Sequence, residues 1–427
     1  MEQIRVYCHA GAQGGRGGEG LRAGQELLTA AGDVARRFAA DRKARRVAAR
    51  EIPFDDDMCD AVHRRTEPLR EQCEALVVLA PPAVALGVRA LQRALNPPTY
   101  NLKSDRLRSG PQLFVLDDAA DPDEVRAVLD LLGPRVKRAF VHAADPVGDS
   151  SAVAAHLAIF ADAVQAKAGK KYKDRLLVTT CPGPTPLRQV AVAEGLKLLD
   201  NPAGATGIDA MFSPAVLFAV EMCGIDIDGV LEGARDMDKQ CREPHAANNP
   251  AAVLAAATFG GAGGRHVTAS PSHDALCEWA AFALPWSGTL VIDVERFAHR
   301  LSVPEAVRKW PTFGPLGGSD LQTLTAARTA AAERAALESG RPAATIRLGQ
   351  VTPQAIGQLA CLIQIAAHFR AALPAALGGS DRTDRVGRRR DRTGDVPPPG
   401  WVAGNDGAVG DKVEPVTAGR GADKVAR

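Results

Sequence analysis

At 427 residues and 44.8 kDa, the chain is longer than one hydrophobic core usually supports, so its length predicts two domains. Its net charge of +2 gives no overall attraction to nucleic acid or to an anionic membrane surface. No stretch approaches the roughly 18 uninterrupted apolar residues of a membrane span, and the N-terminus lacks the basic start and apolar core of a secretory signal. We therefore expect a cytoplasmic protein with neither nucleic-acid nor membrane partners.

The N-terminal part of the chain is irregular until a predicted helix over residues 24–49, whose Arg and Lys residues indicate one solvated face. A turn is predicted over residues 52–57, and the charges of residues 62–73 indicate a surface helix. From Ala75 onward, short apolar runs alternate with helices. This pattern is typical of strands buried on both faces of a parallel sheet.

We expect this first sheet to be doubly wound, with short connections between its elements. Its strands are predicted over residues 75–79, 113–116, 138–142 and 176–179. Its helices are predicted over residues 84–95, 122–132, 151–166 and 186–195. Ligands of such sheets bind outside the carboxyl ends of the strands, so a site is expected at the loops that begin at Ala80, Asp117, Ala143 and Thr180.

A second α/β lobe is expected to follow Pro214. Its helices are predicted over residues 215–223, 229–237, 250–257 and 353–373, and its strands over residues 266–269, 288–292 and 344–348. Beyond Leu377 the apolar periodicity stops. Residues 378–427 are expected to be disordered, because they cannot bury enough apolar area to offset chain entropy.

The eight cysteines are scattered, with no C-x-x-C pair and no cluster with histidine at metal spacing, so they are expected to be small buried hydrophobic residues. His142 and His156 also lack partners at metal spacing. Cys181 follows a predicted strand and is a candidate reactive thiol, although no neighbouring base is evident. The sequence therefore predicts no metal site and no cofactor.

Four blocks of sequence carry a resemblance to a known family. The most specific one contains Phe212-Ser213-Pro214, Gly224-Ile225-Asp226-Ile227, Leu231-Glu232-Gly233-Ala234 and Asn249-Pro250-Ala251. These stretches resemble the F-S-P-V-G-L, G-I-D-I, L-E-G-A and N-P-A landmarks of bacterial phosphoglucose isomerases. The other blocks fall within residues 100–117, 178–188 and 354–360. Over residues 52–375 the chain is thus identified as a member of that family.

The resemblance implies two sugar-isomerase (SIS) lobes, each a three-layer αβα sandwich around a parallel sheet. We expect an N-terminal helical segment over residues 1–65, SIS lobes over residues 66–222 and 223–377, and the tail over residues 378–427. The family interconverts glucose 6-phosphate and fructose 6-phosphate without a cofactor. It is usually homodimeric, with active sites near the subunit interface, so a sugar phosphate and a second subunit are the implied partners.

The positions that carry the family's chemistry hold other residues in this chain. The family's base is a Glu in a Q-L-x-A-E-S block, and Trp286 stands at that position, where an indole cannot accept a proton from carbon. The ring-opening His of a D-Q-H-S block is matched by Gln322, whose amide has no accessible pKa for acid-base catalysis. The Arg that stabilises the enediolate is matched by Ile208. No intact catalytic residue is therefore predicted.

The phosphate pocket implied by the resemblance is altered as well. The family's S-G-G-T-A-E-T loop, at a helix N-terminus, is matched by residues 146–152. Ser150 and Ser151 still offer hydroxyl groups there, but Asp149 would repel a phosphate dianion, and Asp149 or Ser150 also suits the N-cap of the next helix. The family's glycine-rich turn is replaced at residues 80–87, where two prolines remove backbone donors. Its C-terminal Lys has no counterpart.

Three interpretations remain open. The first is an inactive pseudoenzyme or interaction partner that dimerises with itself or with an active homologue. The second is a genuine isomerase whose carboxylate base is relocated to Glu278 or Glu295, one of which should then face the strand-end crevice near Ser150. The third is an altered enzyme or small-molecule sensor with a polar pocket that lacks phosphate donors. Residues 260–264 are glycine-rich, but they lack the Lys-Ser/Thr that makes a phosphate loop specific.

Overall fold

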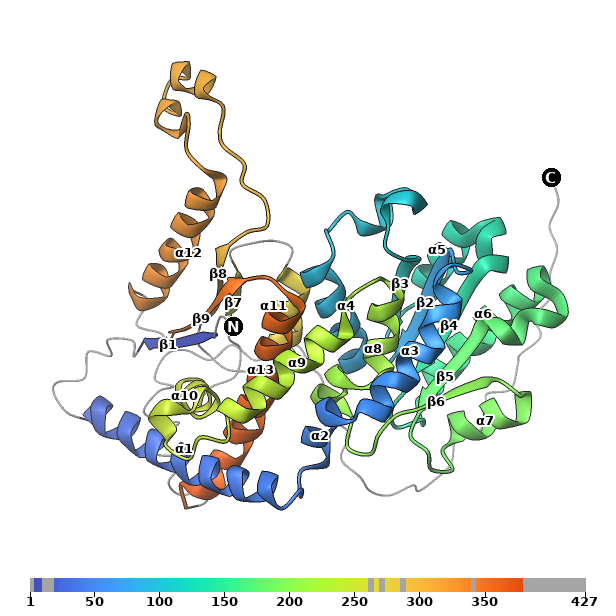
Figure 1. Cartoon of the computed structure of the whole chain (residues 1–427), viewed down its shortest axis with the longest axis horizontal. Helices are drawn as coiled ribbons and strands as arrows, with labels where there is room; N and C mark the ends of the chain where they lie inside the picture. Colours follow the sequence, from blue (N-terminus) through green and yellow to red (C-terminus); the bar gives the residue numbers. More distant parts are fainter. Residues whose placement is uncertain are drawn as a thin grey trace, which may run out of the picture. The chain divides into compact units, whose positions relative to one another are not determined.

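The computed structural model describes residues 4–9, 19–259, 265–268, 273–284, 289–338 and 343–378. These residues form two β-sheets with helices packed on their faces (Figure 1). The predictions made for Trp286, for residues 260–264 and for the tail from residue 379 concern residues outside this described part.

The first sheet is parallel throughout, as predicted, and its strand order is β3-β2-β4-β5-β6. Its strands are β2 (Ala75–Ala80), β3 (Gln112–Asp117), β4 (Ala139–Ala144), β5 (Leu176–Thr180) and β6 (Lys197–Asp200). The first four confirm the predicted strands to within two residues at each end. The edge strand β6 was not predicted, because its two leucines are flanked by Lys197 and Asp200 and make too short an apolar run.

Helices cover both faces of the first sheet and make it the middle of three layers. Successive residues of β2 point to opposite faces. Leu76 and Val78 pack in one core with α3, α4 and α8, whereas Val77 and Leu79 pack in another with α5, α6 and α7. The helices are α3 (Asp56–Arg70), α4 (Pro82–Leu95), α5 (Pro122–Leu132), α6 (Ser151–Ala168), α7 (Pro186–Glu194) and α8 (Pro214–Met222).

Local sequence signals fix where these helices begin. Side-chain oxygens of Asp121, Ser150 and Thr185 accept backbone amides at the starts of α5, α6 and α7, respectively. Proline occupies the first helical position of α4, α5, α7 and α8, where its missing N–H costs no hydrogen bond. The predicted turn at residues 52–57 is instead a 3-10 helix (Ile52–Phe54) that leads into α3, which Asp55 caps.

The second sheet has the order β1-β9-β8-β7. Its parallel strands are β7 (Arg265–Thr268), β8 (Thr289–Arg296) and β9 (Ala343–Gln350), all close to the predicted strands. The unpredicted strand β1 (Arg5–His9) pairs antiparallel with β9, so the N-terminal segment adds an edge to this sheet.

Long helices accompany the second sheet. They are α1 (Glu19–Lys43), α9 (Ile227–Gln240), α10 (Pro250–Ala257), α11 (Asp274–Ala283), α12 (Leu321–Glu338) and α13 (Pro353–Ala376), and a short α2 (Ala48–Glu51) follows α1. By length and composition alone, α13 is apolar enough to cross a membrane, and 56% of its most apolar window is buried inside the protein. It packs against α9, α10 and α1, which is the environment of a core helix.

A single buried core connects the two sheets. It includes Leu76 and Phe140 of the first sheet together with Leu290 and Ile346 of the second. Helix α4 of the first lobe also contacts α11 of the second. The two lobes therefore share one hydrophobic core.

Candidate functional site

The loop that follows β4 occupies the position that the resemblance assigns to phosphate binding, and a buried carboxylate organises it. Asp145 is 1% exposed. Its Oδ1 accepts the amide of Val147 at 3.1 Å, and its Oδ2 accepts the amide of Ser150 at 2.9 Å. A phosphate-binding loop works by aiming free backbone amides at the ligand. Here two of those amides are already bound to the chain's own carboxylate.

The same loop is closed against the end of β5. Gly148 has φ +79°, and a Cβ placed on it would lie 2.4 Å from the hydroxyl oxygens of both Thr180 and Thr185. The Cys181 amide donates to Pro146 O at 3.2 Å, and the Leu187 amide donates to Gly148 O at 2.9 Å. The loop after β4 is thus packed directly against the loop after β5, and there is no room for a side chain at Gly148.

The carboxyl edge of the first sheet carries negative charge. Burial and the neighbouring carboxylates Asp117 and Asp145 raise the pKa of Asp118. Arg89 lies at this edge, but its guanidinium pairs with Asp117 at 3.1 Å. Such an edge repels a phosphate dianion, since like charges in a partly buried site are weakly screened.

The two predicted phosphate-contacting serines differ in role. Ser150 is the N-cap of α6, as the sequence suggested, and its hydroxyl accepts the amide of Val153 at 3.2 Å. Ser151 is exposed at the first position of the same helix. Cys181, the candidate thiol, is half-buried, and its nearest described partner is Val147 O at 3.7 Å. None of these contacts supplies the thiol with a base.

At the position of the family's Arg, Ile208 lies in a 3-10 helix (Gly207–Phe212) and packs against the core. A different guanidinium approaches this segment. Arg50, 2% exposed, pairs with Asp209 and donates to Gln364 Oε1 at 2.8 Å. The Gln364 amide in turn donates to Ile208 O at 2.6 Å. Because Arg50 is buried and paired with Asp209 and Gln364, its charge is not available to a ligand.

His368 completes this network, which the sequence analysis did not anticipate. Its Nε2 lies 2.9 Å from Asp209 Oδ2, and its side chain is 47% exposed. Burial alone would raise the pKa of Asp209, but the hydrogen bond with His368 and the charge of Arg50 lower it below its ordinary value. No local sequence pattern predicts the network, because Arg50 and Asp209 are 159 residues apart.

Gln322, at the position of the family's His, is engaged in the fold. Its side-chain Nε2 donates to Glu295 O at 2.6 Å, and its backbone amide donates to Asp320 Oδ1 at 2.9 Å. The bond to Glu295 connects the start of α12 to the end of β8, and the bond to Asp320 is local to the start of α12. Trp286, which the alignment places at the base position, lies outside the described residues.

Neither candidate for a relocated base belongs to the strand ends of the first sheet. Glu278 is exposed on α11, and Glu295 is exposed near the end of β8, where it acts electrostatically on Arg5 and Asp293. Ser150 begins a helix that packs on the first sheet.

A groove of about 300 Å³ lies on the outer helical layer of the first sheet. Helices α5 and α6 and the loop before α5 line it with Ala120, Pro122, Val125, Arg126, Leu129, His156 and Ile159. Its walls are mainly apolar, and burial within α6 leaves His156 only 8% exposed. The third interpretation expects a polar pocket for another small molecule at the strand ends, and this groove is neither polar nor at the strand ends.

The chain was compared with known proteins. No protein-family model matches it. A glucose-6-phosphate isomerase of Carboxydothermus hydrogenoformans is 25% identical over 72% of this chain and 76% of its own length. The corresponding enzyme of Rubrobacter xylanophilus is 27% identical over 71% of this chain and 77% of its own length. That of Thermus thermophilus reaches 30% identity over 45% of this chain and 43% of its own length.

Solved structures share the fold. A hypothetical protein of Thermus thermophilus superposes with a TM-score of 0.72 at 22% identity, covering 89% of this chain and 96% of its own. A glucose-6-phosphate isomerase of Chlamydia trachomatis superposes with a TM-score of 0.59 at 13% identity, covering 76% of this chain and 70% of its own. The predicted two-lobed α/β architecture is thereby confirmed.

Proposed function

Because the chain belongs to the glucose-6-phosphate isomerase family, we propose that it keeps the SIS fold of that family but does not catalyse the isomerisation. In this proposal it acts by binding, as an inactive member that pairs with a second copy of itself or with an active homologue. A cytoplasmic location and the domain division at residues 65, 222 and 377 are part of the same proposal.

The proposal follows from what aldose-ketose isomerisation requires. A base must reach the proton on carbon, an acid must open the sugar ring, and a cation must stabilise the enediolate. At the matching positions, Gln322 is hydrogen-bonded to backbone and Ile208 is apolar. The nearby Arg50 is neutralised by Asp209. These three side chains therefore supply neither the acid that opens the ring nor a free cation for the enediolate.

One observation supports the proposal most directly. The Asp145 carboxylate accepts two amides of the loop that is matched to the phosphate loop of the family. An incoming phosphate would have to displace a buried carboxylate and would also face Asp118 at the same edge. Losing both hydrogen bonds to a charged acceptor costs about 1.5–3 kcal/mol for each bond, which argues against ordinary sugar-phosphate affinity.

The test is a coupled assay of fructose 6-phosphate conversion to glucose 6-phosphate, with protein purified from a host that lacks its own isomerase. A thermal-shift titration with both sugar phosphates and with inorganic phosphate accompanies it. We expect no turnover above a mock purification and no stabilisation by any of the three ligands. Light scattering after gel filtration should then report a dimer.

Matched variants make the assay decisive. If turnover is found and Glu278→Gln or Glu295→Gln abolishes it, while the exposed control Glu124→Gln on α5 leaves it unchanged, the proposal is wrong and the base has been relocated. Stabilisation by a sugar phosphate without turnover would instead favour a sensor and would reject the claim that Asp145 blocks phosphate binding.

A further inference from the structure

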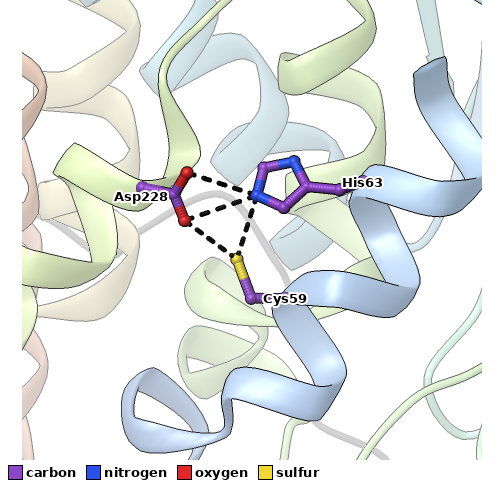
Figure 2. Close-up of side chains that lie close together, drawn as sticks. All are labelled: Cys59, His63 and Asp228. Atoms are coloured by element: carbon purple, nitrogen blue, oxygen red, sulfur yellow. Dashed lines mark hydrogen bonds and ion pairs between the residues drawn. The ribbon is translucent and has the colours of Figure 1, made fainter.

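Three side chains with different metal-binding atoms converge between α3 and α9. Cys59 and His63 lie one helical turn apart on α3, and Asp228 lies in the first turn of α9 (Figure 2). Their Sγ, Nε2 and carboxylate oxygen atoms all lie within 4.8 Å of one another. The cluster belongs neither to the strand-end loops nor to the Asp209 network described above.

The distances within the cluster match the edges of a zinc coordination tetrahedron. Cys59 Sγ lies 3.5 Å from His63 Nε2 and 3.3 Å from Asp228 Oδ1, and His63 Nε2 lies 3.3 Å from Asp228 Oδ1. Zinc bonds of about 2.3 Å to sulfur and about 2.0–2.1 Å to nitrogen and oxygen, at tetrahedral angles, give edges of about 3.5, 3.5 and 3.3 Å, respectively. One ion therefore fits between the three atoms with little movement.

A buried carboxylate orients the histidine for this role. His63 Nδ1 lies 2.5 Å from Glu221 Oε1, and Glu221 is 6% exposed on α8. In the tautomer that carries its proton on Nδ1, His63 donates to Glu221, and its Nε2 lone pair can bind a metal ion beside Cys59 and Asp228. Metal-binding histidines commonly have such a carboxylate partner on their second nitrogen.

Arg70 helps to hold Glu221 in place beside His63. It lies 3.7 Å from Glu221 Oε1 and donates to the backbone oxygen of Glu221 at 2.9 Å.

The surroundings of Cys59 do not suit a nucleophilic cysteine. Cys59 is buried, and its Sγ lies 3.3 Å from the Asp228 carboxylate. A cysteine nucleophile needs neighbouring positive charge, which stabilises the thiolate. A metal ion supplies that charge itself and deprotonates a coordinating thiol.

We propose that Cys59, His63 and Asp228 bind a zinc ion whose fourth coordination position is open to solvent. Cys59 is buried, whereas the side chains of His63 and Asp228 are 36% and 71% exposed, so the open position faces outward. Three protein ligands and one exchangeable position form a site that takes water or a small anionic ligand. The ion links α3, on the first sheet, to α9, which packs against α13.

The experiment is a titration of metal-free full-length protein with Co²⁺, followed by absorption, and then displacement of Co²⁺ by Zn²⁺. We expect one Co²⁺ per chain, with the visible bands of a tetrahedral site and a near-ultraviolet charge-transfer band from a thiolate ligand. Cys59→Ser should abolish the charge-transfer band. Asp228→Asn changes an exposed side chain and should weaken Zn²⁺ binding on the order of 100-fold. Glu221→Gln should weaken Zn²⁺ binding by about 10–100-fold.

The matched control is Cys181→Ser, which removes another accessible thiol and should leave the Co²⁺ spectrum and the Zn²⁺ affinity unchanged. Circular dichroism confirms that each variant is folded. If folded wild-type protein gives no charge-transfer band, or if Asp228→Asn binds Zn²⁺ as tightly as wild type does, the assignment of this site is wrong.

Discussion

The ion pair between Arg50 and Asp209 should be among the most consequential polar contacts of the fold. The Arg50 side chain is 2% exposed and that of Asp209 is 12% exposed. Replacing Arg50 with Met keeps much of the volume but leaves the Asp209 carboxylate buried with only the His368 ring as a side-chain partner among the described residues. Breaking a buried pair from one side costs about 3–5 kcal/mol. We expect Arg50→Met to lose about 3 kcal/mol of unfolding free energy, because the half-exposed His368 remains.

Urea unfolding, followed by tryptophan fluorescence, measures this loss at pH 7. The matched control is Arg36→Met, which removes an exposed pair with Asp33 and should cost no more than about 1 kcal/mol. Adding Asp209→Asn to Arg50→Met should recover most of the loss, since the uncompensated charge is then gone. Two results would refute this reasoning. One is a loss of unfolding free energy in Arg50→Met as small as that in the control, and the other is a double variant that is less stable than Arg50→Met alone.

Three further predictions concern other buried groups. Burial lowers the pKa of His142 from 6.5 to about 3, so the folded protein keeps it neutral while the unfolded chain protonates, and stability falls as pH drops below 6.5. Between pH 6 and pH 4, urea unfolding should show that the unfolding free energy falls less steeply with decreasing pH in His142→Phe than in the wild type. The difference in slope should be up to about 1.4 kcal/mol per pH unit. In the described structure Trp279 is fully buried and its Nε1 has no hydrogen-bond partner, so Trp279→Phe should cost under about 1.5 kcal/mol and Trp279→Ala about 3–5 kcal/mol in the same assay. A Cβ on Gly233 would lie 2.0 Å from Gln354 O, so Gly233→Ala should lower the urea midpoint by an amount equivalent to about 1–3 kcal/mol, whereas Gly183→Ala, where the Cβ meets nothing within 4 Å, should not.

The first sheet was predictable because its strands are buried on both faces. Every residue of β2 and β4 is buried, so β2 appears in the sequence as an uninterrupted apolar run and β4 as a run broken only by His142. The helices between them start at proline and at capping side chains, which are equally local signals. Buried strands and capped helix starts can therefore be recognised from a single sequence.

Elements with weaker local marks were missed. Strand β1 ends next to a glycine-rich stretch, and its place in the second sheet depends on pairing with β9, at the other end of the described chain. Helix α12 is rich in alanine, with polar residues on several sides, so no amphipathic stripe announces it. Contacts between distant parts of the chain determine where β1 and α12 form, so the local sequence alone does not predict either element.

The polar clusters were harder to predict than the fold, for the same reason. His63 and Asp228 are 165 residues apart, and only the approach of α3 to α9 brings them together. One local signal was available, since Cys59 and His63 are spaced to face the same side of a helix. It was overlooked because the helix was predicted to begin at residue 62, which left Cys59 outside it.

The residues that carry the family resemblance perform structural tasks in this protein. Asp226 of the G-I-D-I block caps α9, and Asn249 of the N-P-A block caps α10 while its amide donates to Cys241 O at 2.7 Å. Gly233 of the L-E-G-A block lets the backbone of Gln354 approach α9. Each task depends on the fold alone, so these residues can persist when no substrate is bound. The resemblance matches Gln322 and Ile208 to catalytic positions of the family, and both residues are hydrogen-bonded within the fold. Recognition of the family therefore rests on the scaffold, which explains why it does not by itself establish the activity.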